Sequence, residues 1–243
     1  MSKEANINRH VFQECRRLFL NDPKKIALFP AIKKVWPYTL NNFISLAQIC
    51  DAVDGLENIK GAIVEMGCFN GGSGALMAWR AKRRNQRRDA WLFDSFEGLP
   101  EFSAADKEKA DKKGLGIRGS NSTVMKTTGV FKGEMEKVRE ISKKMGVDDL
   151  VRPIKGWFQN TVPEAKRNIG SIALLHLDAD IYESTKYCLN ELYDLVSQGG
   201  MIILDDYETW TGSRQALYEF FFERKINPSI RYYPYGGKPY FIK

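Results

Sequence analysis

Two short apolar runs in the C-terminal half of the chain each end abruptly in aspartates. Residues 171–177 read SIALLHL and lead into DAD, and residues 201–204 read MIIL and lead into DD. Each run has the length of a buried strand, and the segment between them is long enough for a helix. The pattern predicts two parallel strands joined by a helix, with carboxylates at one edge of the sheet.

The segment between these runs is expected to be a helix that ends at the glycine pair 199–200. Its apolar positions at helical spacing are Cys188, Leu192, Leu195 and Val196. Three other helices are predicted: one that Ser73 caps, one over 131–145, and one that begins at Pro163. Helices of this length between strands are typical of an α/β fold.

Three further apolar runs, 61–66, 89–93 and 150–155, predict additional strands. Aromatic and glycine residues in 231–242 predict a terminal hairpin, which would add an antiparallel strand to a mostly parallel sheet. That topology is expected of a Rossmann-like class I methyltransferase, whose sheet has seven strands, rather than of a dehydrogenase.

Residues 1–60 have apolar positions at helical spacing, interrupted by a proline- and aromatic-rich turn at 29–38. We interpret them as an N-terminal helical cap on a domain formed by 61–243, where the cap forms an oligomer interface or a wall of a substrate cleft. Residues 101–129 are polar and aperiodic, which predicts a lid over the ligand edge.

Composition places the chain among soluble globular proteins. It has 243 residues, 43% of them hydrophobic, and no apolar run near the roughly 20 residues that a membrane helix needs. Cys15, Cys50, Cys68 and Cys188 show no metal-ligand spacing, so we expect core thiols in a reducing compartment. The expected location is the cytoplasm.

The net charge of +7 raises the possibility of a nucleic-acid-binding module. Most of the clustered charge lies in 80–88, which reads RAKRRNQRR. This run closes a predicted helix, where cations complement the helix dipole, and it contains no aromatic residues to stack on bases. We therefore favour a solvated helix end and expect no nucleic-acid partner.

The aspartates after the two C-terminal strands are candidate metal ligands. Parallel strands end at the same edge of a sheet, so these four carboxylates should converge: Asp178, Asp180, Asp205 and Asp206. Clustered carboxylates repel one another unless a cation lies between them, and all-oxygen ligation suits Mg²⁺, Mn²⁺ or Ca²⁺. The alternative is that they merely cap strand ends. His176 is interpreted as a hydrogen-bonded core residue.

The turn after the first strand resembles a cofactor-binding loop. Gly67 and Gly71 allow a ligand to approach the backbone, and the helix that begins near Ser73 offers free N–H groups. Glu65 precedes the first glycine, where an acid disfavours a pyrophosphate and favours a cationic ligand such as the sulfonium and ammonium of S-adenosylmethionine.

The second strand ends in Asp94, where an acid accepts hydrogen bonds from a ribose in doubly wound folds. Phe96, two residues later, is expected either to pack on the adenine or to anchor its loop. The third strand ends at Gly156, Trp157 and Phe158, and Trp157 is expected to flank the adenine.

Taken together, these residues resemble the macrocin O-methyltransferase-like family. The resemblance covers 61–243 and rests on these motifs: VEMG with GGS (64–67, 71–73), FDSFEGLP (93–100), GWF (156–158), LDADIYEST (177–185) and DDY (205–207). Family members are metal- and S-adenosylmethionine-dependent enzymes that methylate sugar hydroxyls. Residues 1–60 match no motif of the family, so we expect acceptor choice to reside there.

The resemblance implies site roles for individual residues. Asp178, Asp205 and Asp206 would ligate Mg²⁺ or Mn²⁺, with Asp178 thereby taking part in catalysis, and Asp180 would be the general base. Glu65, Asp94 and Ser95 would hold the cofactor. Some relatives place a histidine base near this loop, where this chain has Ile181 and Tyr182.

Two enzyme classes remain as alternatives to a sugar O-methyltransferase. A metal-dependent O-methyltransferase acting on a catechol-like phenol would have the same cofactor half, because vicinal hydroxyls on either ring ligate Mg²⁺ alike. A nicotinamide-dependent dehydrogenase is disfavoured because G-x-G-x-x-G is missing. The apolar N-terminal helices favour a homodimer or higher homo-oligomer.

Overall fold

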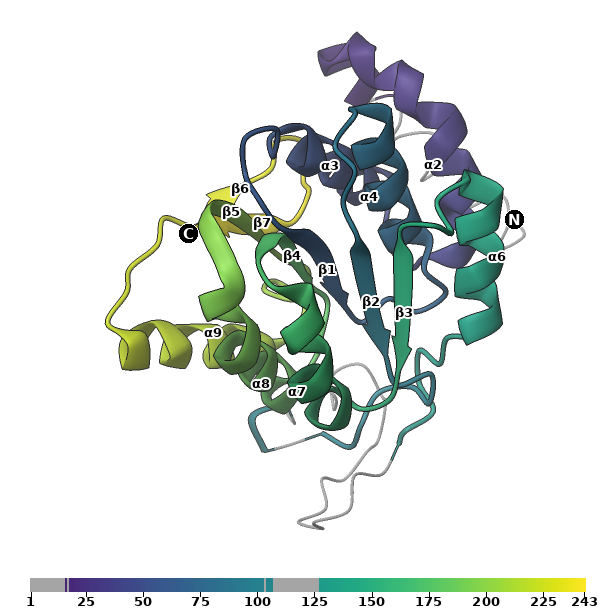
Figure 1. Ribbon diagram of the computed structural model, residues 1–243. Helices are drawn as coiled ribbons and strands as arrows, with labels where there is room; N and C mark the ends of the chain where they lie inside the picture. The colour runs from purple at the N-terminus through teal and green to yellow at the C-terminus, as the bar shows by residue number, and fades with distance from the viewer. Residues whose placement is uncertain (1–15, 17, 103, 107–126) are drawn as a thin grey trace, which may run out of the picture.

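A seven-stranded sheet forms the centre of the protein in the computed structural model, which describes residue 16 and residues 18–102, 104–106 and 127–243 (Figure 1). The strand order is β3-β2-β1-β4-β5-β7-β6. The strands are β1 Ala62–Met66, β2 Ala90–Asp94, β3 Val151–Lys155, β4 Ile172–Leu177, β5 Val196–Leu204, β6 Arg231–Tyr232 and β7 Pro239–Ile242. Strands β1 to β5 are parallel, and β7 runs antiparallel to β5 and to β6. The predicted class I topology is confirmed.

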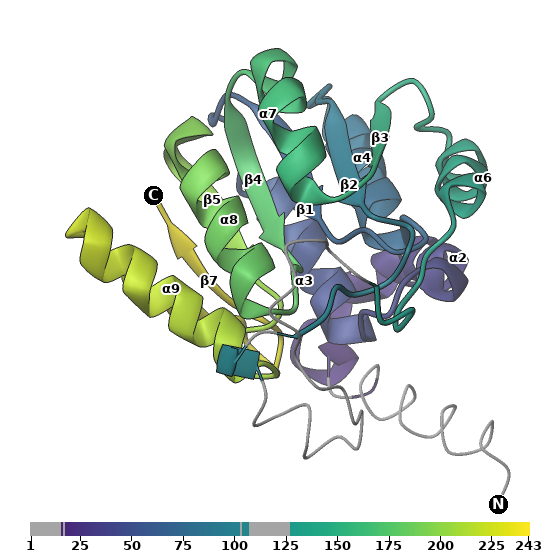
Figure 2. The ribbon, with the colours of Figure 1, turned by 90° about the horizontal axis from the view of Figure 1, so that it is seen from below.

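Helices cover both faces of the sheet (Figure 2). One face carries α2 Phe29–Val35, α3 Phe43–Asp54, α4 Gly72–Arg83 and α6 Met135–Met145, and the other carries α7 Phe158–Ile169, α8 Tyr182–Leu192 and α9 Thr211–Arg224. Buried apolar side chains form one large cluster under each layer. Burial of these two clusters provides the main driving force for folding.

The N-terminal elements pack on α4 and share its core. They comprise η1 Pro23–Leu28, α2, η2 Trp36–Tyr38 and α3. A Cβ on Gly72, the first residue of α4, would lie 2.8 Å from the carbonyl oxygen of Tyr38, so the contact is backbone to backbone. The predicted turn at 29–38 is wrong, because this segment is helical. Its prolines stand near the starts of α2 and η2, where a proline costs no hydrogen bond.

Three predicted helix boundaries are also wrong. Helix α8 ends at Leu192, and the glycine pair 199–200 lies inside β5, where the strand pairs with the last residue of the chain. Helix α4 has Gly71 at its N-cap with a φ of 79°, and Ser73 lies inside the helix. Pro163 lies within α7, which begins five residues earlier.

Some expectations concern residues outside the described ranges. Most of the predicted lid, 101–129, is among them, and only its two ends are described, joined by a bridge between Pro100 and Thr127. Cys15 also lies outside them, whereas Cys50, Cys68 and Cys188 are buried free thiols.

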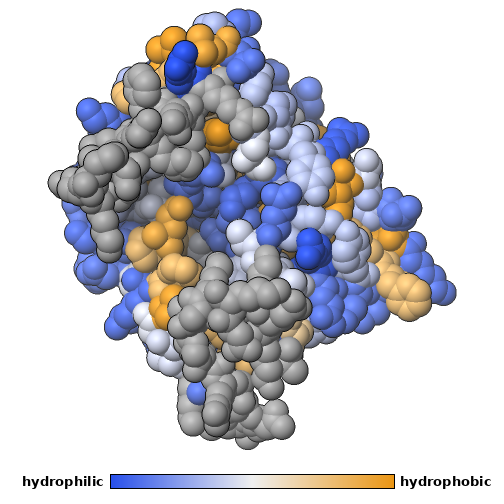
Figure 3. All heavy atoms as spheres, turned by 180° about the vertical axis from the view of Figure 1, so that it is seen from behind, coloured by the Kyte–Doolittle hydropathy of each residue, from blue (hydrophilic) through white to orange (hydrophobic). Residues whose placement is uncertain are grey.

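The surface viewed from behind is largely hydrophilic, with hydrophobic groups in scattered places (Figure 3). The most exposed large apolar side chain among the described residues is Phe222, at 86%. Among the described residues, no helix combines the length and the apolar character needed to cross a membrane.

Candidate active site

Backbone hydrogen bonds align the ends of five parallel strands. The residue that follows each of β1, β3, β4 and β5 donates its N–H to a neighbouring strand end: Gly67 to Phe93, Gly156 to Asp94, Asp178 to Met66 and Asp205 to Leu177, all at 2.8–3.0 Å. The side chains that follow the strands therefore emerge at one level of the sheet edge. A cavity of about 410 Å³ opens there.

Gly67 brings the loop after β1 against the end of β4. Its φ is +93°, and a Cβ at this position would lie 1.8 Å from the carbonyl oxygen of Asp178. Only glycine tolerates both the conformation and the contact. Gly67 and Ser73 line the cavity, whereas Gly71 turns the chain against Val138 of α6.

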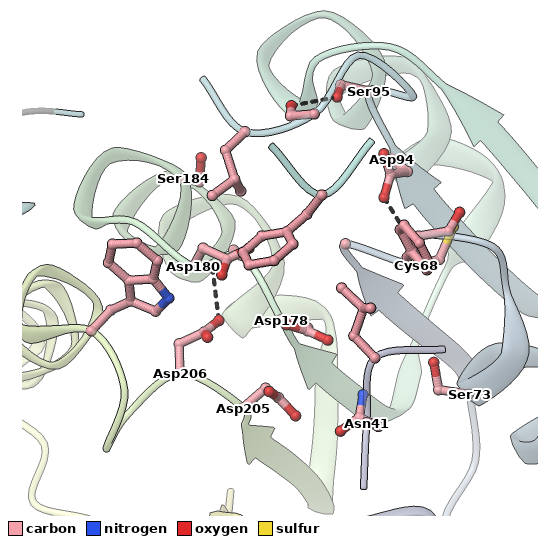
Figure 4. Close-up of a pocket in the computed structure, with 18 of the residues that line it drawn as sticks. Asn41, Cys68, Ser73, Asp94, Ser95, Asp178, Asp180, Ser184, Asp205 and Asp206 are labelled. Atoms are coloured by element: carbon pink, nitrogen blue, oxygen red, sulfur yellow. Dashed lines mark hydrogen bonds between the residues drawn. The ribbon is translucent and has the colours of Figure 1, made fainter. Parts of the chain in front are cut away.

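Asp94 lies at the cavity wall and organises two loops (Figure 4). Its carboxylate accepts the N–H of Phe69 at 2.8 Å and the N–H of Phe96 at 2.7 Å. Burial raises the pKa of Asp94 to about 6, and these two N–H groups oppose the rise. The neighbouring Ser95 also lines the cavity, and its hydroxyl donates to the carbonyl oxygen of Gly98.

The aromatic candidates fall into two groups. Trp157 and Phe158 line the cavity, and Gly156 supports them through its bond to the end of β2. Phe96 is 4% exposed and packs in the core under α4. We expected Phe96 either to pack on the adenine or to anchor its loop, and this buried position is that of a loop anchor. Its backbone has a φ of 54°.

The four predicted aspartates do converge. Oxygens of Asp178, Asp180 and Asp206 lie within 4.8 Å of one another, and Asp205 joins Asp178 and His176 in a second group of the same span. Figure 4 shows all four carboxyl groups around one part of the cavity. This arrangement requires compensation by cations or protons.

The electrostatics of the cluster reflect burial and crowding. Burial and the neighbouring carboxylates raise the pKa of Asp178 well above its usual range, and burial and Asp205 raise that of Asp206 to about 7. Asp180 has a φ of 59°, and its N–H donates to Asp206 at 2.7 Å. Such a conformation in a non-glycine residue is strained, and the hydrogen bond helps to hold it.

Glu65 lies behind the cavity wall, under α4. It is 0% exposed, its Oε1 lies 2.9 Å from Nδ1 of His176, and its Oε2 has no hydrogen-bond partner among the described residues. His176 Nε2 in turn lies 3.4 Å from Asp205. Although burial opposes it, hydrogen bonding to Asp205 and Glu65 raises the pKa of His176 to about 9. His176 thus forms a buried bridge between Glu65 and Asp205, and Glu65 is not among the residues that line the cavity.

Several cavity residues have no counterpart among the predicted ones, and two of them, Lys238 and Asn41, are notable for their contacts. Lys238 donates from Nζ to Asp205 Oδ2 at 2.6 Å, and Asn41 carries a buried Oδ1 without a hydrogen-bond partner among the described residues. Neither belongs to a motif, since Lys238 precedes the final strand and Asn41 lies between two helices. The sequence contains no signal that would have identified them.

Comparison with known proteins places the chain in a family. The macrocin O-methyltransferase (TylF) family matches residues 38–234. Among curated relatives, a tetracenomycin rhamnosyl 4'-O-methyltransferase of Streptomyces olivaceus is 34% identical, and demethyldecarbamoylnovobiocin O-methyltransferase of Streptomyces niveus is 31% identical. Each alignment covers 76% of this chain and 69% of the relative.

Solved structures show the same fold. The O-methyltransferase NovP has a TM-score of 0.72 at 28% identity, covering 85% of this chain and 82% of that protein. The calicheamicin methyltransferase CalS11 has a TM-score of 0.68 at 18% identity, covering 100% and 93% respectively, and at that identity the likeness concerns the fold alone.

Proposed function

The chain belongs to the macrocin O-methyltransferase family, and we propose that this O-methyltransferase transfers the methyl group of S-adenosylmethionine to a hydroxyl of a sugar or a glycosylated small molecule, with Mg²⁺ or Mn²⁺ bound. The observation that carries the proposal is one cavity that contains both Asp94 and the four aspartates. The names of the relatives, which include a rhamnosyl 4'-O-methyltransferase, support a sugar acceptor.

The cofactor would lie between the ends of β1, β2 and β3. Asp94 retains acceptor capacity beyond its two backbone bonds, because an ionised carboxylate offers about four lone-pair sites, and these suit the ribose hydroxyls. Trp157 and Phe158 would flank the adenine. Gly67 and Ser73 would face the methionine end, while Glu65 and Gly71 would act by shaping the loop from behind.

The donor set fits a hard divalent cation. Asp178, Asp205 and Asp206 offer only oxygens, and burial and mutual repulsion raise the pKa values of Asp178 and Asp206, which supports a cation at this cluster. When bound, Mg²⁺ would lower the pKa of an acceptor hydroxyl and orient it. The histidine in this group is already engaged by Glu65 and Asp205.

We propose Asp180 as the general base. It lines the cavity beside the other carboxylates, and its backbone is fixed by Asp206. In the reaction, the acceptor oxygen would attack the methyl carbon, the bond from that carbon to sulfur would break with its electron pair going to sulfur, and the hydroxyl proton would pass to Asp180. General-base assistance of this kind contributes about 10²- to 10⁴-fold.

We also propose the domain division into a cap, 1–60, and a catalytic domain, 61–243, with 101–129 as a lid. A cytoplasmic homodimer or higher homo-oligomer is the proposed state. Three buried free cysteines support a reducing compartment, and exposed apolar side chains on the N-terminal elements, such as Leu20 and Ile26, support self-association.

Methyl transfer to defined acceptors tests the function. The protein is incubated with S-adenosylmethionine, with Mg²⁺ or a chelator, and with rhamnosyl glycosides or catechols, and products are detected by mass spectrometry. Methylated glycoside in the presence of Mg²⁺ is expected. Methylation of catechols alone would favour the phenol alternative, and failure to bind S-adenosylhomocysteine would refute the cofactor assignment.

A further inference from the structure

Lys238 places a fixed positive charge inside the aspartate cluster. Its Nζ donates to Asp205 Oδ2 at 2.6 Å and to the Asp205 carbonyl oxygen at 2.9 Å. Among the described residues that line the cavity, it is the sole lysine or arginine. An ammonium in contact with one carboxylate of a crowded group reduces the repulsion among all of them.

The N-terminal cap holds Lys238 in position. Gln48 of α3 is 2% exposed, and its side chain makes two hydrogen bonds to the backbone of Lys238: Nε2 donates to the carbonyl oxygen at 2.7 Å, and Oε1 accepts the N–H at 2.6 Å. A Cβ on Gly237 would lie 2.5 Å from Gln48 Oε1, so the preceding glycine permits this approach. Backbone and side chain are thus both fixed, unlike those of an ordinary surface lysine.

The ammonium and a divalent cation would compete for the same carboxylate. Lys238 occupies Asp205 Oδ2, and His176 lies 3.4 Å from Oδ1, so both oxygens of Asp205 have partners before a metal arrives. A second cation beside Asp205 is repelled by the ammonium at short range in a buried site, where screening is weak. The same ammonium keeps the carboxylates assembled when the metal is absent.

We propose that Lys238 is the resident counter-cation of the aspartate cluster and that the cap, through Gln48, thereby sets how tightly the site binds a divalent cation. This rests on the proposed metal-dependent function. Lys238 is a positioning residue, because it acts through Asp205. The consequence is a site that stays assembled without metal and binds it weakly enough to exchange.

Mn²⁺ titration of Lys238→Met, followed by electron paramagnetic resonance, tests the proposal. Loss of the ammonium should tighten Mn²⁺ binding by about tenfold or more, which converts to about 1.4 kcal/mol, and should lower the melting temperature of the metal-free protein. Lys238→Arg keeps the charge and should bind Mn²⁺ within a few-fold of the wild type. Gln48→Ala, which frees the backbone of Lys238, should change Mn²⁺ affinity in the same direction as Lys238→Met but less.

A matched control removes one positive charge elsewhere. Lys82 makes an exposed ion pair with Asp149, and Lys82→Met should leave Mn²⁺ affinity unchanged. Weaker or unchanged Mn²⁺ binding in Lys238→Met would overturn the proposal, since an orienting partner without a charge effect gives weaker binding when removed. S-adenosylhomocysteine binding verifies that each variant is folded. A wild type that binds S-adenosylhomocysteine but no Mn²⁺ would refute the metal site itself, which is a separate result.

Discussion

The affinity for S-adenosylhomocysteine should fall about tenfold between pH 8 and pH 5, and Asp94→Asn should remove that dependence. The ribose hydroxyls donate hydrogen bonds, so the ionised form of Asp94 is the one that binds them. Burial raises the pKa of this carboxyl to about 6. One pH unit below the pKa, roughly one molecule in ten retains the carboxylate, which gives the tenfold loss.

The same pKa shift has a predictable effect on stability, opposite in sign to that of a salt-bridged aspartate. Because the folded-state pKa of Asp94 lies above the ordinary value of an aspartate, the folded protein holds this proton more tightly than the unfolded chain. The contribution of Asp94 therefore becomes less favourable as pH rises from about 4 to about 6. Bound cofactor offsets this, since its hydroxyls hydrogen-bond to the charged form.

Calorimetric titration at four pH values between 5 and 8, in metal-free buffer, measures the effect. Asp149→Asn is the matched control, because it removes an exposed carboxylate outside the cavity and should keep the wild-type pH dependence. Equal wild-type affinity at pH 5 and pH 8, or a pH dependence that persists in Asp94→Asn, would show that Asp94 does not contact the ribose.

Three other substitutions probe separate parts of the structure. Asp180→Asn should lower turnover by about 10²- to 10⁴-fold without changing S-adenosylhomocysteine affinity, and unchanged turnover would exclude it as the base. Gly67→Ala should lower the free energy of unfolding in urea by more than Gly146→Ala does. Both glycines have a positive φ, which costs an alanine about 1–2 kcal/mol, but a Cβ on Gly146 would have nothing within 4 Å. Equal costs would contradict the close contact. Asn42→Ala removes the cap that accepts the Ser45 N–H and should cost about 1 kcal/mol, roughly 2–4 °C in melting temperature; no shift would show that the cap is not stabilising.

The strand ends were predictable because they depend on backbone topology. Apolar runs identify the buried strands, and parallel strands must end at one edge, so Asp178 and Asp205 were expected to meet although they are far apart in sequence. One error in a helix boundary arose where backbone pairing overrides local propensity. Glycine pair 199–200 illustrates this, since it joins β5 by pairing with the C-terminal residue.

Side-chain direction explains why Glu65 does not line the cavity, although it lies close to the glycine loop. It is the penultimate residue of β1, and strand side chains stand perpendicular to the sheet. Glu65 therefore points under α4, where its Oε2 would lie 2.7 Å from a Cβ on Gly74. Asp178 follows the last residue of its strand and faces the cavity. Position relative to the strand end, within one or two residues, decides whether an acid faces a ligand or a helix.

The proposed cofactor and metal halves of the cavity are connected by the same backbone hydrogen bonds. Gly67 bonds to β2, and Asp178 bonds to β1 beside the position where a Gly67 Cβ would clash. A displacement of the glycine loop must therefore move Asp178 as well. Gly67→Ala is expected to weaken S-adenosylhomocysteine and Mn²⁺ binding together, whereas Asp178→Asn should weaken Mn²⁺ binding alone, because it changes one side chain and leaves the backbone contact intact. Parallel titrations of both ligands in both variants measure this. Loss of a single ligand in Gly67→Ala would show that the two halves move independently.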